Sequence, residues 1–133
     1  MDRAFPLVPK SNKGLRPGDF WAVPLRDGSY AAGRVLEISG DGPGSRVSFV
    51  GGLMNWHGTE PPQADDMIDR GILDRGRMHL LAITETGGAI LGNTPLDQEV
   101  TGAERGAYPV TGAWGFNFIT VKAQREFLAG HKP

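Results

Sequence analysis

The sequence predicts a single α+β domain that is mainly β, with a curved antiparallel sheet or an SH3-like open barrel and one or two short helices. Its 133 residues include 20 Gly and 10 Pro, a composition typical of a chain with many turns. A hydrophobic fraction of 39% and three Trp still supply a core. The apolar residues fall in short runs bounded by Gly, Pro and Asp, as in strands joined by turns. Residues 1–14 are expected to form a flexible or loosely packed N-terminal arm within this domain.

The first two strands are expected on either side of Asp27-Gly28, a dipeptide typical of two-residue hairpin turns. The cross-strand partners in that register are Leu25 with Tyr30, Ala22 with Gly33, and Trp21 with Arg34. A bend at Gly33 follows, and the Arg34 side chain is expected to stack on Trp21. We favour a structural role for this pair over a ligand platform, because an Arg stem often covers a Trp on a sheet face.

The middle of the chain predicts a strand over residues 46–50 that ends at Gly51-Gly52, followed by an irregular segment. A short helix is expected over residues 62–70, with Thr59 or Glu60 near its cap and Gly71 at its end. Its inner face would comprise Ala64, Met67 and Ile68, and its outer face Asp65, Asp66 and Asp69. Asp66 is expected to pair with Arg70, four residues further on.

The remaining elements are predicted from apolar runs. Residues 77–84 read as a central strand, paired in a hairpin with residues 89–92. An irregular connection over residues 93–113 leads to a strand at residues 114–121 and a helix at residues 122–129 that ends at Gly130. The strand at 114–121 partly parallels an RNA-recognition signature, but three positions depart from it, so we expect a core strand.

Composition and motifs argue against an enzyme and predict no cofactor. The chain has no Cys and no Gly-x-Ser-x-Gly sequence, and the run from Gly40 to Gly44 lacks the helix that a phosphate loop needs. Its three histidines, at 57, 79 and 131, have no metal-ligand spacing. His79 is expected to be buried and hydrogen-bonded. His57, beside Trp56, is either a structural or exposed residue or a partner contact.

Charge is unevenly distributed although the formal net charge is only −1. Residues 1–16 are basic and residues 60–74 are acidic. The near-neutral total argues against nucleic acid as a partner. The apolar run over residues 5–9 is too short and too rich in proline for a signal or membrane segment, so a cytoplasmic protein without membrane contact is expected.

The segment from residue 15 to 38 resembles the start of the bacterial immunity protein 26 family. The matching positions are Arg16, Gly18, Asp19, Phe20, Ala22, Pro24, Leu25, Asp27, Gly28, Tyr30, Ala31, Gly33, Arg34, Val35 and Leu36. The resemblance implies a protein that neutralises a cognate secreted toxin domain and protects the producing cell. These positions resemble a fold motif, and no functional residue is carried over from the family.

Two functions therefore follow as hypotheses. The first is a toxin-binding immunity protein, whose partner surface would comprise Trp56, His57, Glu60, Asp65, Asp66 and Asp69. An acidic surface of this kind would steer and block a basic partner. The alternative is a small barrel of the Tudor or KOW kind that binds nucleic acid or peptide through Trp21, Tyr30 and the basic N-terminal arm. The toxin's identity, the true interface and the oligomeric state do not follow from the sequence.

Overall fold

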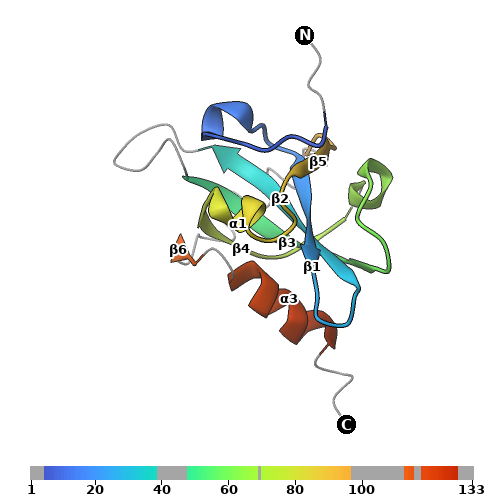
Figure 1. The fold of residues 1–133 in the computed structure, drawn as a ribbon. Helices are drawn as coiled ribbons and strands as arrows, with labels where there is room; N and C mark the ends of the chain where they lie inside the picture. The colour runs from blue at the N-terminus through green and yellow to red at the C-terminus, as the bar shows by residue number, and fades with distance from the viewer. Residues whose placement is uncertain (1–4, 39–47, 69, 97–112, 116–117, 129–133) are drawn as a thin grey trace.

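The computed structural model describes residues 5–38, 48–68, 70–96, 113–115 and 118–128 (Figure 1). The helical and strand segments are η1 (Asn12–Gly14), β1 (Asp19–Pro24), β2 (Tyr30–Ile38), β3 (Ser48–Gly58), η3 (Ala64–Met67), β4 (Ile72–His79), α1 (Leu81–Thr84), β5 (Ile90–Asn93), β6 (Ala113–Trp114) and α3 (Phe118–Leu128), where η marks a 3-10 helix.

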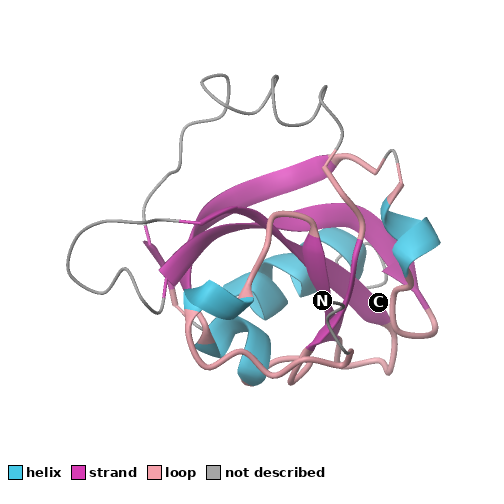
Figure 2. Cartoon of the chain, turned by 90° about the horizontal axis from the view of Figure 1, so that it is seen from above, coloured by secondary structure: helices cyan, strands magenta, loops and turns pink. Residues whose placement is uncertain are grey.

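The strands form one sheet of six strands in the order β5-β1-β2-β3-β4-β6. All neighbouring strands are antiparallel except β4 and β6, which are parallel. Figure 2, seen from above, shows that the strands form a curved sheet. The sheet is not closed, so the predicted α+β, mainly β class with a curved antiparallel sheet is confirmed.

The β1–β2 hairpin differs by one residue from the predicted register. Pro24 lies opposite Tyr30, and the Leu25 N–H donates to the Ser29 carbonyl at 2.8 Å. The loop therefore spans residues 26–28, with Gly28 in its third position at a φ of 88°. A turn followed by a left-handed Gly is the usual three-residue alternative to the two-residue turn. Asp27-Gly28 marks the hairpin correctly, but it does not by itself determine the loop length.

This one-residue slip moves every side chain of β1 relative to β2. Trp21 lies opposite Gly33, fully buried, and its ring meets Phe49 edge-on with centroids 5.8 Å apart. A Cβ on Gly33 would lie 2.3 Å from the Trp21 ring, so the glycine makes room for the indole. Arg34 instead lies opposite Phe20. The predicted stacking of Arg34 on Trp21 is therefore wrong, because the two side chains point to opposite faces.

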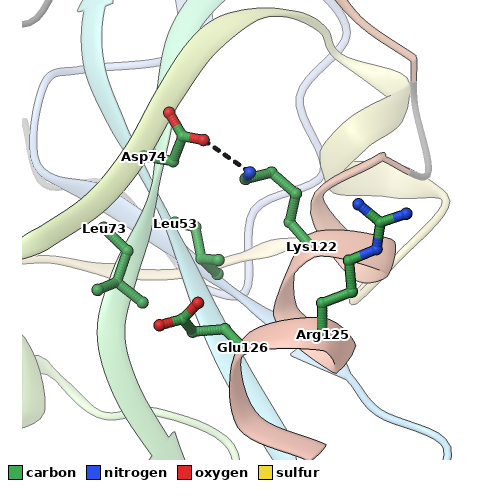
Figure 3. A pocket seen from close by; sticks show the side chains of 6 residues that line it. All are labelled: Leu53, Leu73, Asp74, Lys122, Arg125 and Glu126. Atoms are coloured by element: carbon green, nitrogen blue, oxygen red, sulfur yellow. Dashed lines mark ion pairs between the residues drawn. The ribbon is translucent and has the colours of Figure 1, made fainter. Parts of the chain in front are cut away.

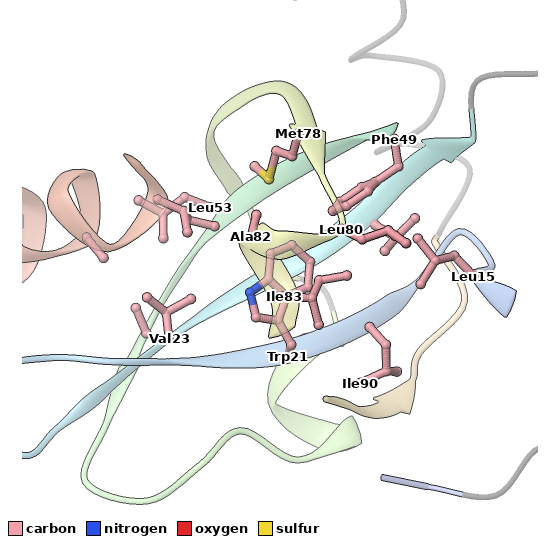
Figure 4. Close-up of a cluster of buried hydrophobic side chains, with 14 of the residues drawn as sticks. Leu15, Trp21, Val23, Phe49, Leu53, Met78, Leu80, Ala82, Ile83 and Ile90 are labelled. Atoms are coloured by element: carbon pink, nitrogen blue, oxygen red, sulfur yellow. The ribbon is translucent and has the colours of Figure 1, made fainter. Parts of the chain in front are cut away.

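The larger core lies on the Trp21 face of the sheet, under α1 and α3 (Figure 4). Its buried members are Leu15, Trp21, Val23, Leu25, Ala31, Val35, Phe49, Leu53, Met78, Leu80, Ala82, Ile83, Ile90, Ile119, Ala123 and Leu128. A smaller cluster lies on the opposite face and comprises Phe20, Ala32, Met54 and Met67. Neighbouring residues such as Leu53 and Met54 divide between the two clusters, as the alternation of a strand requires.

Strand β3 is much longer than predicted. It passes through Gly51 and Gly52 and includes residues 54–58, which the sequence suggested were irregular. A Cβ on Gly51 would lie 2.8 Å from Met78 Sδ and from Phe49 Cε2. The glycine therefore allows close packing of neighbouring side chains inside a strand instead of ending it.

The predicted hairpin between residues 77–84 and 89–92 is wrong. Strand β4 ends at His79, and α1 follows, while β5 pairs with β1 at the other side of the sheet. His79 is exposed rather than buried, and its Nδ1 accepts a hydrogen bond from the Leu81 N–H at 3.0 Å. The apolar run is thus a strand and a helical turn that both contribute to the same core.

The helices also differ from their predicted ranges. The helix expected at 62–70 is the short η3, in which Met67 is buried but Ala64 is exposed; the following Ile68 is exposed too. The strand expected at 114–121 is only the two residues of β6, and α3 already begins at Phe118. The comparison with an RNA-recognition strand therefore fails at Phe118, which is helical. Gly130, the predicted helix stop, lies outside the described residues, as does most of the 93–113 connection.

The first described residues contact the sheet at β5. Leu7 and Ile90 exchange two backbone hydrogen bonds, each of 2.8 Å. Leu7 also packs against the larger core. The described part of the N-terminal arm is therefore attached to β5 at this point.

Candidate functional site

Two buried polar side chains within residues 15–38, those of Asp19 and Arg34, stabilise the fold. The buried Asp19 accepts hydrogen bonds from the Arg16 N–H at 2.9 Å and from Asn93 Nδ2 at 2.8 Å. Gly18 has a φ of 98°, and a Cβ there would lie 2.5 Å from the Thr94 carbonyl oxygen. Asp19 and Gly18 therefore fix the start of β1 against the end of β5.

Arg34 connects three segments on the smaller-core face. Its side chain is only 2% exposed and donates to the carbonyl oxygens of Met67 at 3.3 Å and Pro95 at 3.2 Å, and also to that of Thr94. The Thr94 hydroxyl donates in turn to the Ala64 carbonyl at 2.7 Å. Buried carbonyl groups need such donors, so Arg34 holds η3 and the segment after β5 against the sheet.

Trp56 and His57 do not lie in the irregular segment that the sequence suggested after Gly51-Gly52. Both lie on β3 and point to opposite faces. Trp56 is half-buried and packs against the smaller core. His57 is exposed, stacks on Phe127 of α3 with centroids 5.1 Å apart, and lies with its Nε2 2.7 Å from Ser29 Oγ. The two residues therefore belong to separate environments.

The predicted acidic residues have different roles. Glu60 and Asp65 are exposed, whereas Asp66 is half-buried and its Oδ2 accepts from the Gln63 N–H at 2.8 Å. The Asp66 carboxylate therefore stabilises the start of η3. Arg70 donates through Nε to the Asp66 backbone carbonyl at 3.0 Å, which is not the predicted pairing with its carboxylate. Asp69 lies outside the described residues.

A polar junction that sequence reasoning missed joins the first hairpin to β3 and α3. The Ser29 hydroxyl and the Ser29 N–H both donate to Asp27 Oδ1, the latter at 2.8 Å, and these bonds hold the pKa of the Asp27 carboxyl below its ordinary value. The Arg26 N–H donates to Gln124 Oε1 at 3.0 Å. The spacing Asp-x-Ser is a local signal for such a side-chain turn, but the link to α3 has no sequence signal.

A β-bulge shapes the surface between β4 and α3. Leu53 pairs with Asp74 and Met54 pairs with Ile72, which leaves Leu73 as the extra residue of β4. Leu73 and Asp74 consequently both line the α3 side of the sheet. Ordinary alternation would have turned one of them to the other face.

The bulge creates a pocket of about 210 Å³ (Figure 3). Its lining consists of Leu53, Leu73, Asp74, Lys122, Arg125 and Glu126. Lys122 Nζ lies 2.7 Å from Asp74 Oδ2, so these two charges neutralise each other. In Figure 3, the Arg125 side chain lies on the same side of the pocket as Lys122, and the Glu126 carboxylate lies on the same side as Leu73. The pocket thus has an apolar floor at Leu53 and separated charges around it. We refer to this pocket and the adjoining strand β4 as the β4–α3 groove.

The described residues contain no group of three His, Asp or Glu side chains arranged to hold a metal ion. No helix in the same part of the chain is long and apolar enough to span a membrane. The chain matches no protein-family model, no curated protein and no solved structure. The resemblance of residues 15–38 to the immunity protein 26 family accordingly stays a hypothesis.

Proposed function

We propose that this chain is an immunity protein that binds and neutralises a cognate secreted bacterial toxin domain by direct protein contact. In this proposal the protein acts in the cytoplasm. It inhibits the toxin by binding it and catalyses no reaction. The observation that carries the proposal is an exposed surface with acidic and apolar side chains over residues 59–68. We call this segment the acidic segment.

The acidic segment combines charge with exposed apolar area. Glu60 and Asp65 are exposed, and Ile68 is 55% exposed. An apolar side chain beside charged groups is a typical arrangement for a protein interface, in which the apolar contact supplies affinity and the charges steer association. The acidic charges favour a partner with a basic surface.

The acidic segment is also fixed against the sheet by a buried side chain and by hydrogen bonds to its backbone carbonyl groups. Met67 is fully buried, its carbonyl accepts from Arg34, and the Ala64 carbonyl accepts from Thr94. A preorganised segment loses little conformational entropy when it binds, which favours tight binding. The Tudor or KOW alternative receives no such support, since its proposed stacking residue Trp21 is fully buried and has no free ring face.

Co-expression with a toxin domain encoded immediately upstream tests this function. The chain should restore growth and co-purify with the toxin domain as a stable complex. Failure of both would overturn the proposal for that pair.

The double variant Glu60→Lys and Asp65→Lys tests the acidic segment within that complex. Its association rate should fall by about tenfold at low ionic strength, and the loss should shrink as salt is added, because steering by exposed charges is screened. Glu85→Lys is the matched control, since Glu85 is an exposed acid outside this segment. An unchanged association rate for the double variant, or an equal loss for the control, would contradict the role of the acidic segment.

A further inference from the structure

We propose that the pocket of the β4–α3 groove receives an arginine side chain of the toxin domain. The aliphatic stem of that arginine would pack on Leu73 and Leu53, and its guanidinium group would pair with the Glu126 carboxylate. This inference rests on the proposed function and gives the same partner a second contact of defined chemistry, on the α3 side of the sheet.

The first argument is the apolar surface and the size of the pocket. Leu73 is 38% exposed although it belongs to a strand, and Leu53, which is 1% exposed, forms the floor beside it (Figure 3). The pocket volume of about 210 Å³ is below the roughly 300–1,000 Å³ of pockets that enclose a drug-sized ligand. The pocket therefore suits one long side chain of a partner better than a whole ligand. An aliphatic stem lying on Leu73 would remove that leucine from water.

The second argument is that one carboxylate of the pocket has no counter-charge among the described residues. Asp74 is engaged at both oxygens, since Lys122 Nζ lies 2.7 Å from Oδ2 and the Arg75 N–H donates to Oδ1 at 2.8 Å. Glu126 is exposed, and no ion pair to it is found in the part of the chain that the structure describes. Its carboxylate lies on the same side of the pocket as Leu73 (Figure 3). A cationic side chain can therefore use the apolar surface and the carboxylate at the same time.

The third argument is that this arrangement favours a cation over a carboxylate as the occupant. The Arg125 side chain lies on the side of Lys122, away from Leu73 (Figure 3). A carboxylate paired with Arg125 would therefore leave Leu73 uncovered, whereas a cation paired with Glu126 would cover it. A toxin domain with a basic surface, which the acidic segment favours, supplies such cations.

Arginine fits the pocket better than lysine. Its planar guanidinium group can donate two parallel hydrogen bonds to one carboxylate and is more weakly hydrated than an ammonium group. Its stem can lie along apolar surface while the charged end stays near water. These properties match an apolar floor next to the exposed Glu126 carboxylate.

Affinity measurements with the isolated toxin domain test the two contacts of the pocket. Glu126→Gln should weaken the complex by about tenfold, because it removes the counter-charge and keeps the size of the side chain. Leu73→Ala should weaken it by about fivefold, because the arginine stem loses its apolar contact. Unchanged affinity for either variant would overturn the inference.

Two matched controls lie outside the pocket. Glu85→Gln removes an exposed acid, and Leu81→Ala truncates a leucine that is 40% exposed on α1. Each control should change the affinity by less than about twofold. Losses equal to those of the pocket variants would contradict a specific role of the pocket.

Single replacement of each surface arginine of the toxin domain by methionine tests the pairing itself. One of these toxin variants should bind the unsubstituted chain about tenfold more weakly, yet it should lose little further affinity for the Glu126→Gln chain, because the pair is already broken. Methionine keeps an aliphatic stem, so the comparison isolates the charged group. Losses that add to that of Glu126→Gln for every arginine would overturn the pairing, because independent contacts show no coupling.

The outcomes separate the two proposals. A complex that forms, that depends on Glu60 and Asp65, and that tolerates Glu126→Gln retains the proposed function and overturns the arginine pocket. The absence of any complex with the unsubstituted chain overturns both.

Discussion

The two faces of the sheet are stabilised in different ways. Under α1 and α3, the larger core fills the space with apolar side chains around the fully buried Trp21. On the opposite face, the smaller cluster is supplemented by the buried Arg34, which donates to three backbone carbonyl groups. The difference teaches that the short η3 and the segment after β5, which bring little apolar volume, are held by directed hydrogen bonds instead.

The largest loss of stability is expected for substitutions on the Trp21 face of the sheet. Trp21→Ala should lower the free energy of unfolding by about 3–5 kcal/mol, because it removes a large buried ring and leaves a cavity beside Gly33. Trp21→Phe should lose much less, since among the described residues Trp21 Nε1 has no hydrogen-bond partner to forfeit. Urea unfolding measures both variants. Equal losses would mean that the indole N–H, not the ring volume, dominates this face.

A somewhat smaller effect with a different chemical signature is expected on the Arg34 face. Arg34→Met should cost about 3 kcal/mol, because it leaves buried carbonyl groups without donors. Arg34→Lys should recover little of the lost stability, because an ammonium group cannot donate in the several fixed directions of a guanidinium group. The same unfolding measurements check both. Full recovery by lysine would show that charge alone, and not directed hydrogen bonding, holds this face together.

The smallest effect is expected at the polar junction of the first hairpin. The donors from Ser29 lower the pKa of Asp27 in the folded state, so this carboxylate stabilises the fold above its unfolded pKa, near pH 4, and the contribution is lost as pH falls through the folded pKa. Asp27→Asn should therefore flatten the acid side of the pH–stability profile. An unchanged profile in the variant would contradict this role for Asp27.

Much of the fold could be predicted from local patterns. The turn residues Asp27-Gly28 correctly place the first hairpin, and the short apolar runs correctly indicate a mainly β domain. The predicted register of the β1–β2 hairpin was wrong because Asp27-Gly28 suits both two-residue and three-residue loops. The predicted end of β3 was wrong because two consecutive glycines are typical of a strand end. In the structure, Gly51 and Gly52 lie inside the strand, where neighbouring side chains leave no room for a Cβ.

The candidate site was predicted only in part. The exposure of Glu60 and Asp65 agrees with the pattern of charges around η3. The separation of Trp56 from His57 depends on β3 continuing past Met54, which the glycine pair obscured. The β4–α3 groove depends on a bulge at Leu73 and on α3 reaching the sheet from the far end of the chain, and neither has a local sequence signal.

We propose that residues 15–38 chiefly determine the fold, while the contacts with a toxin domain lie on the acidic segment. The most direct test compares Trp21→Ala with the double variant Glu60→Lys and Asp65→Lys, measuring the free energy of unfolding and the rate of association with the toxin domain at a temperature where both variants are folded. We predict that Trp21→Ala loses stability but keeps its association rate, whereas the double variant keeps its stability and associates more slowly. The opposite pattern, in which Trp21→Ala slows association and the double variant does not, would contradict this proposal.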